Sequence, residues 1–97
     1  MSSDGDDHHD DRHKAALNAK QRGIDHYVAA RYSEAERAFT EAIAISTRGD
    51  PSLHLYYSNR CAARMNLEKI RDALGDAKKT TELKGLSLIH ISEPTRP

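Results

Sequence analysis

The stretch that decides the fold is residues 19–42, AKQRGIDHYVAARYSEAERAFTEA, because residues 57–80, YSNRCAARMNLEKIRDALGDAKKT, repeat its pattern of small residues. The repeated pairs are Gly23 and Cys61, Ala35 and Ala73, Phe39 and Ala77, and Ala42 and Thr80. Every pair is separated by 38 positions (61 − 23). Self-similarity at a fixed period is the signature of a repeat architecture. The spacing within each copy predicts two antiparallel helices in close contact, so we expect a stacking module and not a catalytic pocket.

Three short runs make the pattern specific. Residues 19–23 read AKQRG, residues 31–35 read RYSEA, and residues 57–63 read YSNRCAA. From Lys14 to about Lys84 the chain resembles the tetratricopeptide repeat (TPR) family, and within it the co-chaperone type marked by the Tyr-Ser-Asn-Arg run. It is similar to the families of tetratricopeptide repeat protein one and of the Hsp-organising proteins. The resemblance implies an all-α fold of tandem antiparallel helix-turn-helix repeats, an α-solenoid fragment.

The repeat spacing also predicts where one connection is longer than usual. The family repeat has about 34 residues. A spacing of 38 therefore implies four extra residues, and residues 47–50, which read TRGD, are the natural place for them. Insertions in a surface loop cost little free energy.

Composition and patterning divide the chain into segments. With 97 residues, 37% hydrophobic, one Phe and no Trp, the chain can bury one modest core. We expect residues 1–12 to form a disordered acidic and histidine-rich tail. Two TPR units are expected over residues 13–46 and 51–84, within a repeat region of 13–85. Residues 86–97 are expected to be an adaptor-derived tail. The last segment looks like translated sequencing-adaptor DNA, so it is excluded from the fold prediction. We also expect the array to be cut short, since the last helix pair lacks a capping neighbour.

Helix signals follow one another through the repeat region. The expected helices span residues 13–30, 34–46, 51–66 and 69–83, and no segment shows strand periodicity. Ser33 and Glu36 have the spacing of a capping box for the second helix. Asp50 is the expected cap of the third helix, with Pro51 in its first turn.

Charge and cysteine content indicate which kind of partner and which cellular compartment to expect. The chain has fifteen basic and fifteen acidic residues, but residues 1–11 contain five Asp and no Lys or Arg, so residues 12–97 carry a net charge of +5. The basic residues are in mild excess and are interleaved with acidic residues. This pattern favours an acidic peptide partner over nucleic acid. A lone Cys61 excludes an internal disulfide and fits a reducing compartment. The N-terminus shows no apolar stretch, so we expect no secretory signal, no membrane segment and a cytoplasmic location.

The resemblance also implies a binding site. In the co-chaperone type, the first helices of successive repeats grip the C-terminal carboxylate and acidic side chains of a heat-shock chaperone tail. Lys20 matches the family's first-repeat lysine and Asn59 its second-repeat asparagine. Ile24 stands where the family has another asparagine, which removes one donor, and the third-repeat lysine and arginine are missing. With two of the five usual positions, we expect weak binding, in which charge-assisted hydrogen bonds hold a carboxylate.

Other functional classes fit the sequence less well. We expect no enzyme, no catalytic residues and no cofactor, because no nucleophile with its base, paired carboxylate or phosphate loop is evident. His8, His9 and His13 accompany several Asp residues, but a segment without fixed geometry does not make a metal site, so we expect none. Cys61 is expected to pack at a helix crossing, and Arg60 to pair with an acid. The alternative function is a TPR scaffold that binds an internal peptide or another protein with no chaperone link.

Overall fold

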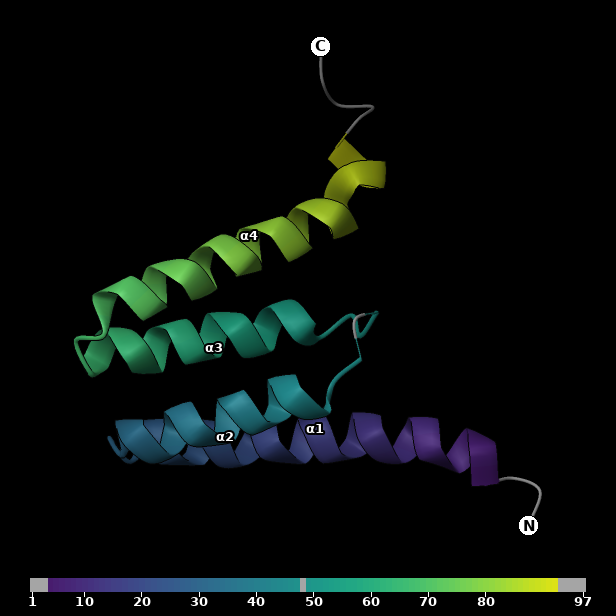
Figure 1. Ribbon diagram of the computed structural model, residues 1–97, viewed down its shortest axis with the longest axis horizontal. Coiled ribbons are helices and arrows are strands. Elements are labelled where there is room, and N and C mark those ends of the chain that lie inside the picture. Colours follow the sequence, from purple (N-terminus) through teal and green to yellow (C-terminus); the bar gives the residue numbers. More distant parts are fainter. Residues whose placement is uncertain (1–3, 48, 93–97) are drawn as a thin grey trace.

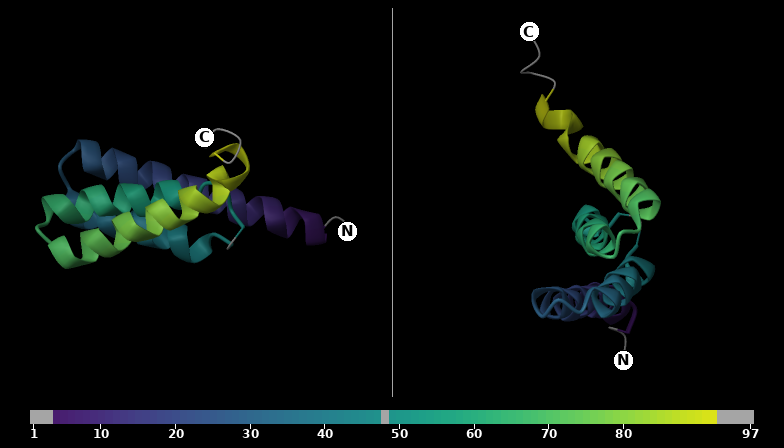
Figure 2. Two further views of the ribbon diagram at one scale, coloured as in Figure 1. Left: turned by 90° about the horizontal axis from the view of Figure 1, so that it is seen from above. Right: turned by 90° about the vertical axis from the view of Figure 1, so that its left-hand side faces the viewer.

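The computed structural model describes residues 4–47 and 49–92, and the surroundings of the side chains within residues 11–47 and 49–84. It contains four helices: α1 (Asp4–Val28), α2 (Tyr32–Ile45), α3 (Leu53–Asn66) and α4 (Ile70–Ser92). The first two helices form one hairpin and the last two form a second hairpin, with α3 lying on the first (Figures 1 and 2). No strand occurs in the described ranges. The all-α prediction of tandem helix-turn-helix repeats is therefore confirmed.

The two hairpins turn in the same way. Ala30 and Glu68, which are 38 positions apart, adopt left-handed backbone conformations with φ of 65° and 64°. Matching 2.8 Å hydrogen bonds close the turns, from Arg31 N–H to the His26 carbonyl and from Lys69 N–H to the Arg64 carbonyl. A left-handed residue followed by such a bond ends many helices, although glycine usually occupies the position. The internal repeat therefore extends to the backbone of the turns.

Small residues allow the helices of each hairpin to approach closely. A Cβ atom placed on Gly23 in α1 would lie 2.4 Å from Cε1 of Phe39 in α2. Ala35 and Ala73 are fully or almost fully buried, as the repeat pattern predicted. Ala77, by contrast, is exposed on α4. It takes the position of Phe39, so the second hairpin lacks the buried aromatic ring of the first.

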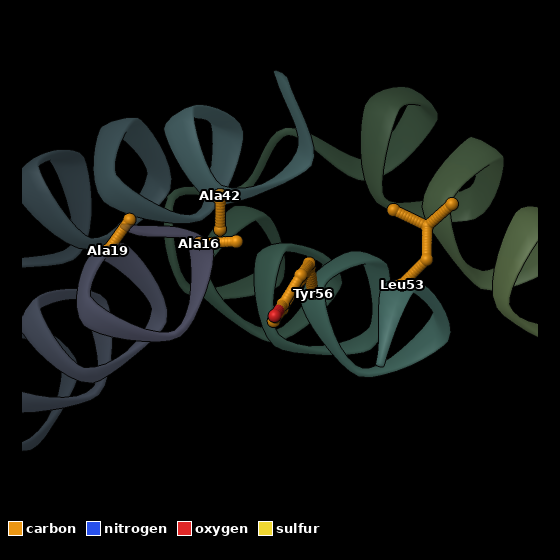
Figure 3. Packing of buried hydrophobic residues seen from close by; sticks show 5 residues of the cluster. All are labelled: Ala16, Ala19, Ala42, Leu53 and Tyr56. Atoms are coloured by element: carbon orange, nitrogen blue, oxygen red, sulfur yellow. The ribbon is translucent and has the colours of Figure 1, made fainter. Parts of the chain in front are cut away.

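Two clusters of buried side chains hold the hairpins together. The larger consists of Ala16, Ala19, Ala42, Leu53 and Tyr56 and joins α1, α2 and α3 (Figure 3). The smaller consists of Ala35, Phe39 and Ala63, with Ile24 and Tyr27 packed against it. Tyr56 and Phe39 are the largest fully buried side chains. Two aromatic rings and several alanines thus make up most of the described core.

Helix α1 begins nine residues earlier than expected. The structure is helical from Asp4, although we expected residues 1–12 to be a disordered tail; residues 1–3 lie outside the described part. Arg12 gives one reason, because its Nε and Nη2 atoms donate to the Ile45 carbonyl at 3.1 and 3.0 Å, at the C-terminal end of α2. Once this turn is fixed, extending the helix costs less than nucleating it, because each added residue gains one backbone hydrogen bond.

The other helix ends also differ from the expected bounds. Helix α4 continues past Leu83 to Ser92, so Gly85 does not end it and residues 86–92 of the expected adaptor-derived tail are helical. A single glycine inside a helix costs about 1 kcal/mol, which continued backbone bonding offsets. The connection between α2 and α3, residues 46–52, is longer than the connections of three residues within the hairpins. The four extra residues therefore lie where the repeat spacing predicted, with Arg48 outside the described part.

The predicted helix caps are only partly correct. Ser33 lies inside α2, which begins at Tyr32, and the preceding Arg31 makes no side-chain capping bond. The capping box is absent because Glu36 pairs with cations of the second repeat instead. At the third helix, the Asp50 carboxylate accepts the Ser52 N–H at 2.8 Å, and α3 begins at the following residue. Asp50 thus orders this helix start, one turn before the assigned boundary.

Candidate functional site

A small hollow lies between the first helices of the two hairpins. Its volume is about 70 Å³, and its lining residues are Ile24 and Tyr27 of α1, Phe39 of α2, and Asn59 and Ala62 of α3. The side chains of Ile24 and Tyr27 pack against the smaller core cluster with their inner faces. The hollow is therefore an opening above the core whose walls are fixed by packing. We call it the α1–α3 groove.

Asn59 supplies the side-chain amide among the residues that line this groove. Its side chain is half-buried, and none of the hydrogen bonds found among the described residues involves its amide. A carboxamide offers two N–H donors and one carbonyl acceptor. A half-buried amide without an intramolecular partner can therefore hydrogen-bond a bound ligand.

Lys20 lies on α1, four residues before Ile24. Residues at this spacing are neighbours on one face of a helix, so Lys20 lies one turn from the α1–α3 groove. Its side chain is half-buried, and no salt bridge involving it occurs among the described residues. The structure thus brings Ile24 and Asn59 together in the groove, while Lys20 is not among the lining residues. The binding roles of Lys20 and Asn59 remain predictions.

A chain of ion pairs next to the groove fixes α3 in place. The buried Asp76 of α4 accepts hydrogen bonds from Arg60 Nε and Nη2 at 3.0 and 2.8 Å and from Arg64 Nη1 at 2.9 Å. The Asp76 side chain is only 5% exposed, so its charge needs these partners. Arg60 also donates to the Thr40 hydroxyl of α2 at 3.2 Å. The prediction that Arg60 pairs with an acid is confirmed. Arg60 directly follows Asn59, and its bonds to α2 and α4 hold this part of α3 from both sides.

The same network continues to Glu36 of α2. Its carboxylate accepts hydrogen bonds from Arg64 Nε at 2.7 Å and from Lys69 Nζ at 2.8 Å. Burial by itself would raise the pKa of Glu36, but the bonds and positive charges of Lys69 and Arg64 together outweigh it and lower the pKa below its ordinary value. A carboxyl with a depressed folded-state pKa contributes stability above its unfolded pKa, about 4.3. That stability is lost as the pH falls through the folded pKa.

The place of Asp76 in this network was not expected from the sequence. The signal that could have found it is its position three residues after Ala73, since residues at that spacing share a helix face. Ala73 is 1% exposed and Asp76 is 3% exposed. An acid on the buried face of a helix needs a cation, and Arg60 and Arg64 are the two arginines on the preceding helix.

Cys61 lies on α3 and is half-buried. Burial raises the pKa of its thiol, and the negative charge of Asp76 raises it further. A thiol with a raised pKa forms little of the reactive thiolate at neutral pH. The environment of Cys61 is therefore that of a packing residue.

Among the described residues, no group of three or more His, Cys, Asp or Glu side chains is placed to hold a metal ion. His8 and His9 lie outside the residues whose side-chain surroundings are described. No described helix has the length and apolar character needed to cross a bilayer.

Curated proteins with similar sequences decide the family. Over 69 residues the chain is 44% identical to the Hsp70-Hsp90 organizing protein of Triticum aestivum and 42% identical to the STIP1 homolog of Dictyostelium discoideum. These relatives contain TPR repeats, as does the DnaJ homolog subfamily C member 7 homolog of Schizosaccharomyces pombe, which is 40% identical over 72 residues. The chain belongs to the tetratricopeptide repeat family. The two helix hairpins, repeated every 38 residues, are its TPR units.

The matches cover most of this TPR chain but little of its relatives. They span 71%, 71% and 72% of the chain, and only 11%, 12% and 15% of the wheat, Dictyostelium and fission-yeast proteins. The chain thus spans between a tenth and a sixth of the length of these relatives. No family model matches the chain, and no solved structure matches it with significance.

Proposed function

We propose that this TPR chain is part of a co-chaperone adaptor and that its α1–α3 groove binds the acidic C-terminal peptide of a heat-shock chaperone. The observation that carries the proposal is Asn59, whose half-buried amide lines the groove and has no partner among the described residues. Two of the relatives are named for organising Hsp70 and Hsp90 or for homology to STIP1. The proposal includes no catalytic step and no cofactor.

Charge supports an acidic ligand. Residues 12–97 carry a net charge of +5, and Lys20 places an ammonium group one turn from Ile24 on α1. Hydrogen bonds between a cation and a carboxylate are stronger than those between neutral groups. Asn59 adds amide donors for the same carboxylate without adding a further charge. We place this function in the cytoplasm, where a lone unpaired Cys61 stays reduced.

One observation favours a second candidate. Ile24 lines the groove at the position where the co-chaperone type has an asparagine, so the groove is largely apolar beside Asn59. A TPR scaffold that binds an internal peptide or another protein, without a chaperone link, would use such a groove without a terminal carboxylate.

Fluorescence anisotropy of labelled peptides separates the two candidates. An acidic peptide with a free C-terminal carboxylate should bind more tightly than the same peptide with an amidated C-terminus. Lys20→Ala and Asn59→Ala should each weaken binding of the free acid by about 1–3 kcal/mol, as expected for losing a hydrogen bond to a charged group. Added salt should also weaken binding, because it screens charges in an open groove.

Two matched variants control for non-specific effects. Lys14→Ala removes an exposed lysine from α1, and Asn18→Ala removes an exposed amide from the same helix. Both should bind like the parent chain. Equal affinities for the free acid and the amidated peptide, unchanged in Lys20→Ala and Asn59→Ala, would reject the carboxylate site and leave the scaffold candidate.

A further inference from the structure

Helix α4 has an outer face that is apolar and uncovered. Among the described residues α4 packs against α3 alone, and it lies at the edge of the molecule (Figures 1 and 2). Ile70 and Leu74 on this face are 49% and 62% exposed, and the exposed Ala77 and Thr81 continue it along the helix. The four residues follow one another at steps of four, three and four, so they share one side of the helix. We call them the α4 outer face.

The internal repeat shows that such a face can receive a helix. Shifted back by 38 positions, the α4 outer face becomes Tyr32, Glu36, Phe39 and Ile43 of α2. Helix α3 covers that face, because Glu36 accepts a hydrogen bond from Arg64 and Phe39 shares a core cluster with Ala63. The α4 outer face therefore has the position of a helix-docking surface. Its chemistry differs, since Leu74 replaces the charged Glu36.

Head-to-tail stacking of copies, with α1 of one copy on α4 of the next, does not suit this face. The residues with which α3 joins the core clusters include the buried Tyr56 and Ala63. The positions 38 residues earlier, on α1, are Asn18 and Asp25. Docking α1 on the α4 outer face would take an amide and a carboxylate out of water against apolar side chains, which opposes binding.

The α4 outer face is complementary to itself. In an antiparallel pair of α4 helices centred between Leu74 and Ala77, Leu74 of each copy lies opposite Ala77 of the other, so a large side chain meets a small one. The exposed Arg71 and Glu82 are eleven residues apart (82 − 71), which is about three turns, so they lie on the same flank of the face. The same pairing brings Arg71 of each copy toward Glu82 of the other.

We infer that two copies of this chain associate through their α4 outer faces as an antiparallel, two-fold symmetric pair. In such an interface a contact of one residue with a second is repeated with the copies exchanged, which the pairing of Leu74 with Ala77 satisfies. Removal of Ile70 and Leu74 from water drives the association. No α4 residue lines the α1–α3 groove, so the inference is independent of the proposed peptide binding.

Sedimentation velocity of the full chain, from micromolar to millimolar concentration, tests the association. The mass should rise from that of a monomer to that of a dimer and no further. Leu74→Lys should weaken the dimer at least about 10-fold, because it removes an apolar contact and adds a charge near Lys78. The matched control is Val28→Lys. Val28 is 80% exposed but lies on α1, so this variant should dimerise like the parent chain.

Charge exchange tests the antiparallel pairing. Arg71→Glu and Glu82→Arg each place like charges opposite one another, so each variant alone should dimerise several-fold more weakly than the parent. An equimolar mixture of the two variants should recover the parent affinity, because each copy then meets the opposite charge. Circular dichroism should show the same helix content in all variants.

Three results would overturn the inference. The first is a parent chain that stays monomeric up to millimolar concentration, and the second is a Leu74→Lys variant that dimerises as tightly as the parent. The third is a series of species larger than a dimer, which would indicate head-to-tail stacking. A mixture of Arg71→Glu and Glu82→Arg that pairs no better than either variant alone would overturn the antiparallel arrangement.

Discussion

Replacing Gly23 with alanine should force α1 and α2 apart. The new Cβ atom would lie 2.4, 2.6 and 2.8 Å from Cε1, Cδ1 and Cζ of Phe39, all well below ordinary contact distance. Phe39 is 1% exposed and belongs to the smaller core cluster, so packing holds its ring on every side except the small α1–α3 groove. Close-packed interiors transmit such a clash to the backbone.

The magnitude follows from two opposing effects. Alanine favours a helix interior over glycine by about 1 kcal/mol. Overpacking a filled core costs about 1–3 kcal/mol, and a clash with three ring carbons belongs in the upper part of that range. Gly23→Ala should therefore lower the free energy of unfolding by about 1–2 kcal/mol. Gly75→Ala is the matched control, because apart from its chain neighbours and the adjoining helix backbone no atom lies within 4 Å of its Cβ position, and it should raise stability by about 1 kcal/mol.

Urea denaturation followed by far-UV circular dichroism measures both effects. The two variants should move the midpoint in opposite directions from the parent chain. Trimming the ring with Phe39→Leu should make Gly23→Ala less costly, and a double-mutant cycle isolates that coupling. If Gly23→Ala were as stable as Gly75→Ala, the close crossing of α1 and α2 would be wrong, and with it the structural reading of the repeated small residues.

Three further predictions concern the network and the turns. Asp76→Asn should destabilise the chain by about 3 kcal/mol because it leaves the half-buried Arg60 without an acidic partner and Arg64 with Glu36 alone, whereas the exposed Asp72→Asn should change the urea midpoint little. Ala30→Gly should raise the free energy of unfolding by about 0.5–1 kcal/mol, since glycine adopts a φ of 65° without strain; a lower urea midpoint would contradict this reading of the turn. Glu36→Gln should be less stable than the parent at pH 7, and the difference should shrink as the pH falls below about 4. A difference that did not change with pH would show that the Glu36 charge is unimportant.

The parts of the fold that could be predicted are those fixed by steric repetition. Ala35 and Ala73 recur 38 residues apart because helices that cross closely exclude larger side chains, and both lie buried as expected, as does Gly23. The order of helices and the longer connection between the hairpins follow from the same period. Local patterns in the sequence are enough to predict these contacts because the same contacts occur in both repeats.

The parts that could not be predicted depend on partners that are distant in sequence. Glu36 has the spacing of a cap for its own helix, but two cations from the second repeat use its carboxylate instead. Helix α1 extends before His13 because Arg12 reaches the Ile45 carbonyl, 33 positions away. Neither contact leaves a periodic signal. The groove is similar, since Asn59 and Ile24 were singled out separately and only the folded chain places them around one hollow.

The most direct test of the central claim is a titration of the ¹⁵N-labelled chain with an acidic peptide, followed by the side-chain amide resonances in a two-dimensional NMR spectrum. The claim is that a ligand carboxylate reaches the α1–α3 groove and bonds to Asn59. The Asn59 side-chain NH₂ pair should shift strongly with the free-acid peptide and weakly with the amidated one, while the exposed Asn18 amide should stay unchanged. Shifts confined to α4, or an Asn59 response that is the same for both peptides, would contradict it.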